Sequence, residues 1–91
     1  MTLLSREEIA AGLPGHWGHE GDALVLDRTL ADFDAAMAFA VAVADIARQA
    51  DHHPDILVHG YNRVRLTVST HSEGGITERD LALARAVDAL G

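Results

Sequence analysis

Two short segments gather polar side chains of the kinds that carry out acid–base chemistry. They are Asp51-His52-His53-Pro54 and Ser69-Thr70-His71-Ser72. An imidazole, with an ordinary pKa of about 6.5, both donates and accepts protons near neutral pH. Each well-placed acid or base contributes roughly 10²- to 10⁴-fold to a rate. Two or three such groups suffice for a dehydration, so the two segments predict acid–base catalysis without a metal ion.

A metal site is one alternative use of these residues. His52, His71 and Asp51 supply three candidate ligands, the number that a catalytic zinc site needs. No two histidines have the i, i+4 spacing that places both on one helical face. Neighbouring helical side chains diverge by about 100°, so His52 and His53 are not expected to bind one ion together. The spacing therefore favours metal-free chemistry.

A Ser–His–Asp hydrolase is a second alternative, built from Ser69 or Ser72 with His71 and Asp80. Neither serine lies in a G-x-S-x-G elbow, and the sequence shows no clear oxyanion hole. The remaining interpretation is a structural or surface role, which is favoured for three histidines that have no catalytic neighbours: His16, His19 and His59.

The composition excludes several classes of protein. The chain has 91 residues, the size of one domain, so residues 1–91 are predicted to form a single domain. Seven basic and 14 acidic residues give a net charge of −7, which argues against nucleic acid or anionic membrane as a partner. The absence of cysteine excludes disulfides, zinc fingers and thiol nucleophiles. A chain this small without disulfides often gains stability by self-association.

The first residues and the longest apolar run predict where in the cell the protein lies. The first residues, MTLLSREEI, place Arg and Glu where an export signal needs an apolar core. The apolar run 35–44 is too short for the ~18 residues of a membrane span. We therefore expect a cytoplasmic protein with no membrane partner.

The candidate site must be positioned by helices and strands whose ends are marked in the sequence. Ser5 and Glu8 form a capping-box pattern ahead of a short helix over residues 6–12. A β-hairpin follows, from Trp17 through a turn at 20–22 to a second strand over 23–30. Asp32 is a good N-cap for a long helix, and Pro54 predicts that this helix ends around 51–53.

The long helix carries two apolar stripes. One contains Phe33, Met37, Ala40, Val41, Ala44 and Ala47, and the other contains Phe39, Val43, Ile46 and Ala50. One stripe is predicted to pack on the sheet. The other packs either against a partner subunit or inside the core of the same chain.

The last third of the chain predicts two strands and a helix. Residues 56–58 form a short strand, and 61–70 alternate between apolar and polar residues, as in a half-buried strand. Residues 73–75 form a loop, and Thr77 with Asp80 repeats the capping pattern ahead of a helix over 78–90. The order of helix, two strands, helix, two strands and helix predicts an α+β fold with a small antiparallel sheet.

Four blocks of the sequence resemble the pterin-4a-carbinolamine dehydratase family. They are Asp51-His52-His53-Pro54, Tyr61-Asn62-Arg63-Val64, Ser69-Thr70-His71-Ser72 and Thr77-Glu78-Arg79-Asp80. Trp17 ahead of the hairpin and the Asp32-Phe33 helix start extend the resemblance across nearly the whole chain. The blocks occur in family order and spacing, and their combination is far more specific than any one of them.

The resemblance implies a lyase that removes water from the 4a-carbinolamine of tetrahydropterin, the product left when an aromatic amino acid hydroxylase has used its cofactor. It implies a small-molecule pterin substrate and no metal or cofactor. It also implies a four-stranded antiparallel sheet with helices packed on one face, and a homodimer or homotetramer. A non-catalytic pterin-binding or protein-assembly module of the same fold is the alternative.

The resemblance also assigns roles to residues. By similarity, His52, His53 and His71 line the pterin pocket. One group must protonate the departing 4a-hydroxyl while another removes a proton from a ring nitrogen, and we hypothesise that His52 and His71 share these roles while His53 mainly binds. The groups that hold the ring system are, by the same similarity, Asp51, Ser69, Thr70 and Ser72.

One position departs from the family pattern. Four residues before His52, where the family usually has an acidic residue, this chain has Arg48. A cation one helical turn away disfavours the protonated form of a nearby imidazole, and this weakens proton transfer. Asp45 and Asp51 flank this position and can offset the change.

Overall fold

The three α-helices begin at the capping residues that the sequence predicts. In the computed structural model, which describes residues 2–91, α1 (Arg6–Gly12) follows Ser5. The Ser5 hydroxyl accepts a hydrogen bond from the Glu8 N–H at 3.1 Å, and the Glu8 carboxylate accepts one from the Ser5 N–H at 2.9 Å. Helix α3 (Glu78–Asp88) begins with a second capping box, from Thr77 to Asp80. These contacts satisfy N–H groups that have no partner within the helix.

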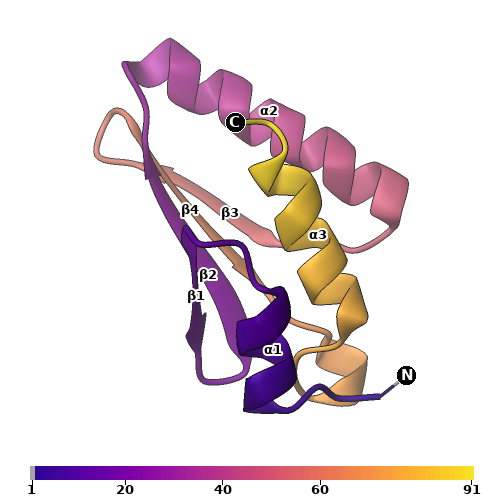
Figure 1. The fold of residues 1–91 in the computed structure, drawn as a ribbon. Helices are drawn as coiled ribbons and strands as arrows, with labels where there is room; N and C mark the ends of the chain where they lie inside the picture. Colours follow the sequence, from indigo (N-terminus) through magenta and orange to yellow (C-terminus); the bar gives the residue numbers. More distant parts are fainter. Residues whose placement is uncertain (1) are drawn as a thin grey trace.

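The sheet has four antiparallel strands: β1 (Trp17–Glu20), β2 (Ala23–Thr29), β3 (Asp55–His59) and β4 (Arg63–Val68). Their spatial order is β1-β2-β4-β3, so β1 and β3 are the edges. All three helices lie on one face of the sheet (Figure 1). The predicted α+β class, element order and four-stranded sheet are confirmed.

The core lies between the sheet and the helices. Alternate residues of the central strands point inward, so that Leu24 pairs with Val68 and Leu26 with Leu66. Leu81 and Leu83 of α3 are also buried. Full burial of each such side chain is worth about 1.5–3 kcal/mol. Val64, Leu66 and Val68, the apolar residues of the alternating segment, therefore point into the core.

Helix α2 (Phe33–Ala50) leaves the large residues of one apolar stripe exposed, although Ala40 and Ala47 of that stripe are buried. Phe39 and Val43 pack in the core. Phe33, Met37 and Val41 remain exposed, so within residues 2–91 these large side chains have no core to enter. The alternative in which both stripes pack inside one chain is wrong.

The connection between β3 and β4 corrects the predicted strand over 61–70. Gly60 and Tyr61 have positive φ angles of 58° and 73°, and the Asn62 N–H donates to the Gly60 carbonyl at 2.8 Å. A positive φ with an i to i+2 hydrogen bond is the geometry of the rare, strained γ-turn. Tyr61 and Asn62 therefore belong to the turn, and β4 begins at Arg63.

Two further element ends differ from the prediction. A short 3₁₀ helix, η1 (His71–Glu73), follows β4 where the sequence predicts a loop from 73. Helix α3 ends at Asp88, two residues before the predicted end at Leu90. Within the described residues, no helix is long and apolar enough to cross a membrane.

The cap of α2 provides a test of the fold. The Asp32 carboxylate accepts a hydrogen bond from the Ala35 N–H at 2.8 Å. We expect Asp32→Ala to lower the free energy of unfolding by about 1 kcal/mol, because this N–H loses its partner. Urea unfolding measures the change. Asp34→Ala removes a carboxylate from the same first turn without a cap contact, and an equal loss in both variants would contradict the capping role.

Candidate active site

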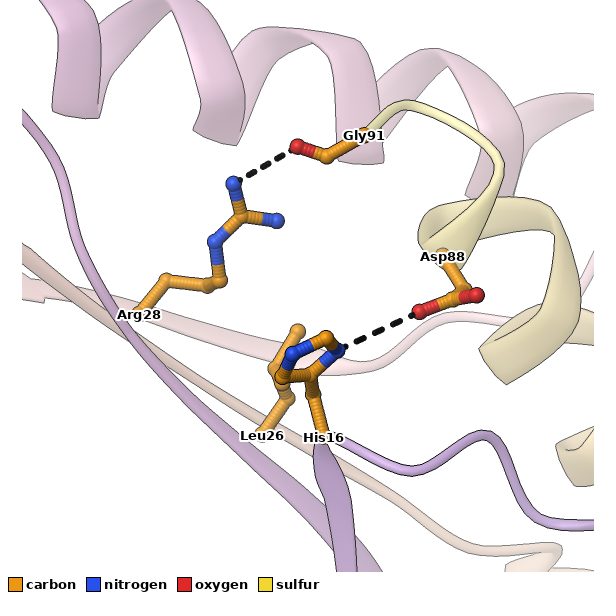
Figure 2. Close-up of a pocket in the computed structure, with 5 residues that line it drawn as sticks. All are labelled: His16, Leu26, Arg28, Asp88 and Gly91. Carbon is orange, nitrogen blue, oxygen red and sulfur yellow. Dashed lines mark hydrogen bonds and ion pairs between the residues drawn. The ribbon is translucent and has the colours of Figure 1, made fainter.

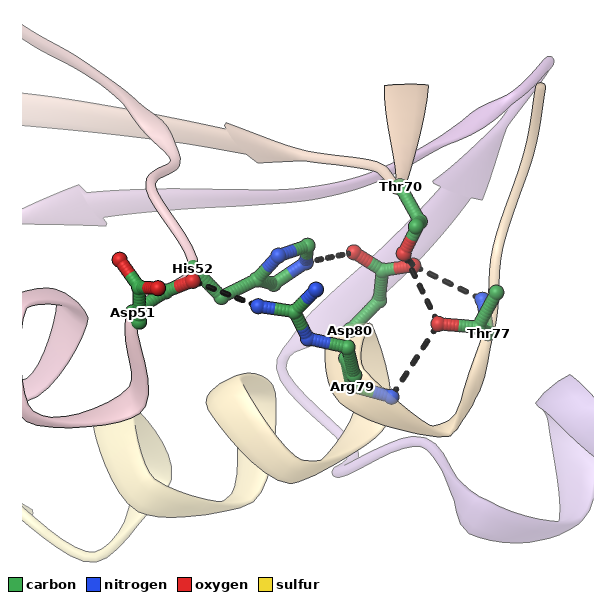
Figure 3. A network of polar contacts seen from close by, with 6 residues as sticks. All are labelled: Asp51, His52, Thr70, Thr77, Arg79 and Asp80. Carbon is green, nitrogen blue, oxygen red and sulfur yellow. Dashed lines mark hydrogen bonds and ion pairs between the residues drawn. The ribbon is translucent and has the colours of Figure 1, made fainter. Parts of the chain in front are cut away.

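The end of α2 places His52. Asp51 has a left-handed backbone conformation (φ 50°, ψ 45°), which Asp tolerates better than most residues. The Asp51 N–H donates to the Arg48 carbonyl at 3.3 Å, and the His52 N–H donates to the Ala47 carbonyl at 3.2 Å. This is the Schellman pattern of helix termination. It turns the chain after the last helical residue and directs the His52 ring toward the start of α3 (Figure 3).

His52 contacts a buried carboxylate. Its Nε2 lies 2.6 Å from Oδ1 of Asp80, a residue with no exposed surface. The other oxygen, Oδ2, accepts hydrogen bonds from the Thr70 hydroxyl and the Thr77 N–H, both at 2.8 Å. The carboxylate thus acts as acceptor in three contacts, as an ionised carboxylate does. These donors replace the water that burial removes.

The hydroxyl groups of Thr70 and Thr77 can donate their hydrogen bonds in only one order. The Thr70 and Thr77 hydroxyl oxygens lie 2.8 Å apart. Because the Thr70 proton points to Asp80, the Thr77 hydroxyl donates to the Thr70 oxygen. The Thr77 oxygen in turn accepts from the Arg79 N–H at 3.3 Å. Every hydroxyl proton therefore has an acceptor, which makes the network rigid.

The Asp80 contact sets the tautomer of His52. A carboxylate can only accept, so the proton of the neutral ring resides on Nε2, and Nδ1 carries the lone pair. No group within residues 2–91 forms a hydrogen bond with Nδ1. The side chain is about 10% exposed. His52 can therefore accept a proton at Nδ1, and Asp80 would stabilise the resulting imidazolium.

The structure brings two of the predicted site residues together. Thr70, at the end of β4, is buried and joins His52 through Asp80. His53 follows His52 directly, and His71 follows Thr70; both are exposed. The two predicted segments therefore meet at Asp80, with an exposed imidazole next to each buried member. The predicted binding residues without a side-chain contact to this network are Asp51, Ser69 and Ser72, of which Ser69 is half-buried and the others exposed.

Three residues at the start of α3 complete the arrangement, and of these only Asp80 was a predicted site residue, in the hydrolase alternative. Asp80 pairs with His52 rather than with His71, which corrects the hydrolase alternative. Thr77 contributes both its N–H and its hydroxyl. The Arg79 guanidinium donates to the Asp51 carbonyl at 2.5 Å and holds the backbone just before His52. The sequence signal that marks this position is the second capping box. The structure shows that its acidic residue, Asp80, also has a buried partner outside α3.

The described residues contain no cluster of ligands for the metal alternative. In residues 2–91, no group of three or more His, Cys, Asp and Glu side chains is placed to hold an ion. Asp51 is exposed and points its carbonyl, not its carboxylate, into the network (Figure 3). Its backbone oxygen is already occupied by Arg79.

A cleft of about 350 Å³ lies apart from these residues and is lined by His16, Leu26, Arg28, Asp88 and Gly91 (Figure 2). Arg28 donates to the Gly91 carbonyl at 2.9 Å, and its guanidinium lies 4.9 Å from the centre of the Phe39 ring. None of the predicted site residues lines this cleft. The candidate site therefore rests on the polar network and not on this cleft.

The comparison with known proteins gives the family. A sequence model described as "Pterin 4 alpha carbinolamine dehydratase" matches residues 2–90. The chain belongs to this dehydratase family. A relative from Thermomicrobium roseum is 55% identical over 73 residues, which cover 80% of this chain and 76% of that protein. One from Chloroflexus aurantiacus is 49% identical over 90 residues, covering 97% and 96%. Both are provisionally named pterin-4-alpha-carbinolamine dehydratases.

A solved structure agrees with the fold of this dehydratase-family chain. It is the crystal structure of a protein from Brucella melitensis that is named "transcriptional coactivator/pterin dehydratase". It aligns with a TM-score of 0.88 and 33% identity, covering 98% of both chains. The family relationship supports a pterin carbinolamine dehydratase activity and a small-molecule pterin as the substrate class.

Proposed function

We propose that this chain catalyses the dehydration of 4a-hydroxytetrahydropterin to quinonoid dihydropterin, the activity of a 4a-hydroxytetrahydrobiopterin dehydratase. In this role it recycles the pterin cofactor of aromatic amino acid hydroxylases and uses no metal or cofactor of its own. The buried His52–Asp80 pair carries the proposal, because it holds an imidazole in a defined tautomer, and the two exposed histidines, His53 and His71, directly follow His52 and Thr70 in the chain. Membership of the dehydratase family supports the same reaction.

The reaction requires one proton donor and one proton acceptor. The C4a–O bond breaks, the departing hydroxyl takes up a proton and leaves as water, and a ring nitrogen loses a proton. The net change is the loss of one water molecule, with no oxidation or reduction. Imidazoles suit both transfers because they gain and lose protons near neutral pH.

The contact between His52 and Asp80 supports the role of His52, and the other roles are part of the proposal. His52 presents Nδ1 as the base, because Nε2 is bonded to Asp80. His71, exposed on η1, is the acid that protonates the 4a-hydroxyl, and exposed His53 mainly binds the ring system. The Thr70 hydroxyl donates to Asp80 and the Thr70 N–H donates to the Gly75 carbonyl at 2.8 Å, so Thr70 contributes to substrate binding by holding this network in place. The remaining polar contacts to the pterin come from Asp51, Ser69 and Ser72.

A coupled hydroxylase assay tests the proposal. The purified protein is added to an aromatic amino acid hydroxylase that generates the 4a-carbinolamine, and the absorbance of this intermediate is followed. We expect the protein to accelerate its loss over the spontaneous reaction. A decay rate that does not change with protein concentration would refute catalysis.

A non-catalytic pterin-binding or assembly role is the second candidate. Two observations favour it: the Brucella melitensis protein is named a coactivator as well as a dehydratase, and the stripe of Phe33, Met37 and Val41 is exposed. In that case a partner recovered from cell extract persists when His52 and His71 are replaced and is lost when the stripe is made polar. A partner that is lost only with the histidines would contradict this role.

Arg48 gives a prediction for the proposed reaction. Its guanidinium is exposed and bonded to Asp45 on the same helix face. We expect Arg48→Glu to raise kcat roughly two- to fivefold, because reversing one exposed charge changes the activation free energy by about 0.5–1 kcal/mol. The gain should shrink at high salt, because the charge is screened. Arg6→Glu, which changes an exposed Arg on α1, is the matched control, and an equal gain there would attribute the effect to net charge.

A further inference from the structure

Strand β2 carries an arginine on the side that faces the helices. Arg28 continues the row of Leu24 and Leu26, which both point into the core. Because side chains alternate along a strand, position 28 lies on the same face as these leucines. Its guanidinium carbon is 4.9 Å from the centre of the Phe39 ring on α2, as this orientation requires. A charged group therefore takes a place at which apolar residues build the core.

The Arg28 guanidinium is half-buried and has few partners. The Gly91 carbonyl accepts one hydrogen bond from it at 2.9 Å. Within residues 2–91, no carboxylate forms an ion pair with Arg28. A guanidinium has five N–H donors, so most of them have no acceptor from the described part of the chain. Burial of an unpaired charge is unfavourable, so an anion bound here would be stabilised.

The cleft beside Arg28 arises because β1 is shorter than β2. Strand β1 has four residues and β2 has seven, and Trp17 at the start of β1 pairs with Leu26. Residues 27–29 therefore pair with β4 on one side and with no described strand on the other. The end of α3 closes this space only in part, which leaves the cleft of about 350 Å³. Small-molecule sites typically have volumes of about 300–1,000 Å³.

We propose that this cleft binds a small monocarboxylate with an apolar body, and that Arg28 holds the carboxylate. The cleft lies at the C-terminal end of α3, where Asp88 lines it. The candidate active site lies at the N-terminal end of the same helix, with Asp80. A helix of 11 residues is about 16 Å long, so the two sites are separate. The binding site does not depend on the proposed function.

The setting of Arg28 suits a carboxylate. Stacking on the Phe39 ring restricts the plane of the guanidinium and leaves its N–H edge free. This planar edge can donate two parallel hydrogen bonds to the two oxygens of one carboxylate. The contact with the Gly91 carbonyl shows that an oxygen acceptor fits beside this edge (Figure 2).

The surroundings favour a ligand with a single negative charge. Asp88 faces the opening from the side opposite Arg28, and its carboxylate lies 3.8 Å from Nδ1 of His16 (Figure 2). The whole chain has a net charge of −7. These negative charges repel a phosphate or a dicarboxylate more strongly than a monoanion. Leu26 adds an apolar surface to the lining, which matches an apolar body on the ligand.

Trp17 provides a reporter for this cleft. It is the single tryptophan of the chain, it follows His16 and it pairs with Leu26, and both of these neighbours line the cleft. Its Nε1 is buried and has no hydrogen-bond partner among the described residues. Buried donors without a partner are rare in folded proteins. A ligand in the cleft therefore binds close to the only indole N–H, and it should shift the NMR signal of that group.

A titration with cyclohexanecarboxylate tests the site. We expect the indole N–H signal of isotope-labelled protein to shift along a saturation curve. Cyclohexanecarboxamide has the same shape without the charge, and inorganic phosphate has charge without the apolar body; both should bind at least tenfold more weakly. A signal that does not move at millimolar carboxylate, or that moves equally with the amide, would overturn the proposal.

Substitutions of Arg28 test its role. Arg28→Leu extends the apolar row of β2, so the fold should be kept while the affinity for cyclohexanecarboxylate falls at least tenfold. Arg28→Lys keeps the charge but loses the planar fork, so its affinity should fall several-fold. Arg63→Gln removes an exposed charge from β4 and is the matched control, with wild-type affinity expected.

Urea unfolding shows whether each variant is folded, and Arg28→Lys decides the question if Arg28→Leu does not fold. Wild-type affinity in either folded Arg28 variant, or an equal loss in Arg63→Gln, would overturn the role of Arg28.

The same titration separates this cleft from the candidate active site. His52→Gln should bind cyclohexanecarboxylate as the wild type does, because His52 contacts the other end of α3. A tenfold loss in His52→Gln without a loss in Arg28→Leu would place the carboxylate at the candidate active site and overturn the proposal. The coupled assay decides the proposed function independently, since neither cyclohexanecarboxylate nor Arg28 takes part in it.

Discussion

Replacing Asp80 with alanine is expected to abolish catalysis and to lower the free energy of unfolding by about 3–5 kcal/mol. The change leaves three groups without their acceptor: His52 Nε2, the Thr70 hydroxyl and the Thr77 N–H. Each buried unpaired donor costs about 1–3 kcal/mol, and α3 also loses half of its capping box. Urea unfolding and the coupled assay measure the two effects.

Asp80→Asn separates the two roles of this carboxylate. The amide has nearly the same shape and keeps one oxygen as acceptor, so we expect a smaller loss of stability than for alanine. Its NH₂ group cannot accept, so it would displace the proton from the facing His52 nitrogen or lose the contact. Activity should therefore fall far more than stability. Glu78→Gln changes an exposed carboxylate in the same helical turn and should leave both nearly unchanged. An asparagine variant as active as wild type would contradict the proposed role of Asp80.

His52→Gln is expected to reduce kcat by roughly 10²- to 10⁴-fold with little change in KM, because the variant loses a base but not a binding surface. Glutamine can donate its NH₂ to Asp80, so this variant avoids leaving the buried carboxylate unpaired, as His52→Ala would. Steady-state kinetics in the coupled assay give both constants.

His16→Gln is the matched control for this substitution. His16 is exposed and lines the separate cleft with Asp88. We expect its kcat to equal that of the wild type. If His52→Gln changes only KM, His52 binds the substrate without moving a proton, and the base must be sought at His53 or His71.

The helix starts could be predicted because their signals are local. Ser5 with Glu8, Asp32, and Thr77 with Asp80 satisfy backbone groups within three residues, so nothing distant is needed to recognise them. The turn at Tyr61 could not be predicted in the same way. Its positive φ is fixed by the pairing of β3 with β4, and a tyrosine has no intrinsic preference for it.

The candidate site was predicted at its ends but not at its centre. His52 and Thr70 were recognisable because polar residues at the ends of neighbouring elements tend to meet. Asp80 was considered only as a partner of His71, and its pairing with His52 was not predicted, because its capping role already explains an acidic residue at that position. Its contact with His52 spans 28 residues and depends on how α3 packs beside the end of α2. Only the packed fold reveals that one carboxylate serves both.

The double duty of Asp80 constrains how this chain can change over generations. A substitution there removes a helix cap and the partner of His52 in one step, so selection against misfolded protein acts on it before any difference in activity is tested. A catalytic base supported by a separate, dispensable carboxylate could lose that support gradually. Here the same carboxylate orients the imidazole and is needed for folding. A lineage that no longer needed the reaction would therefore still retain Asp80.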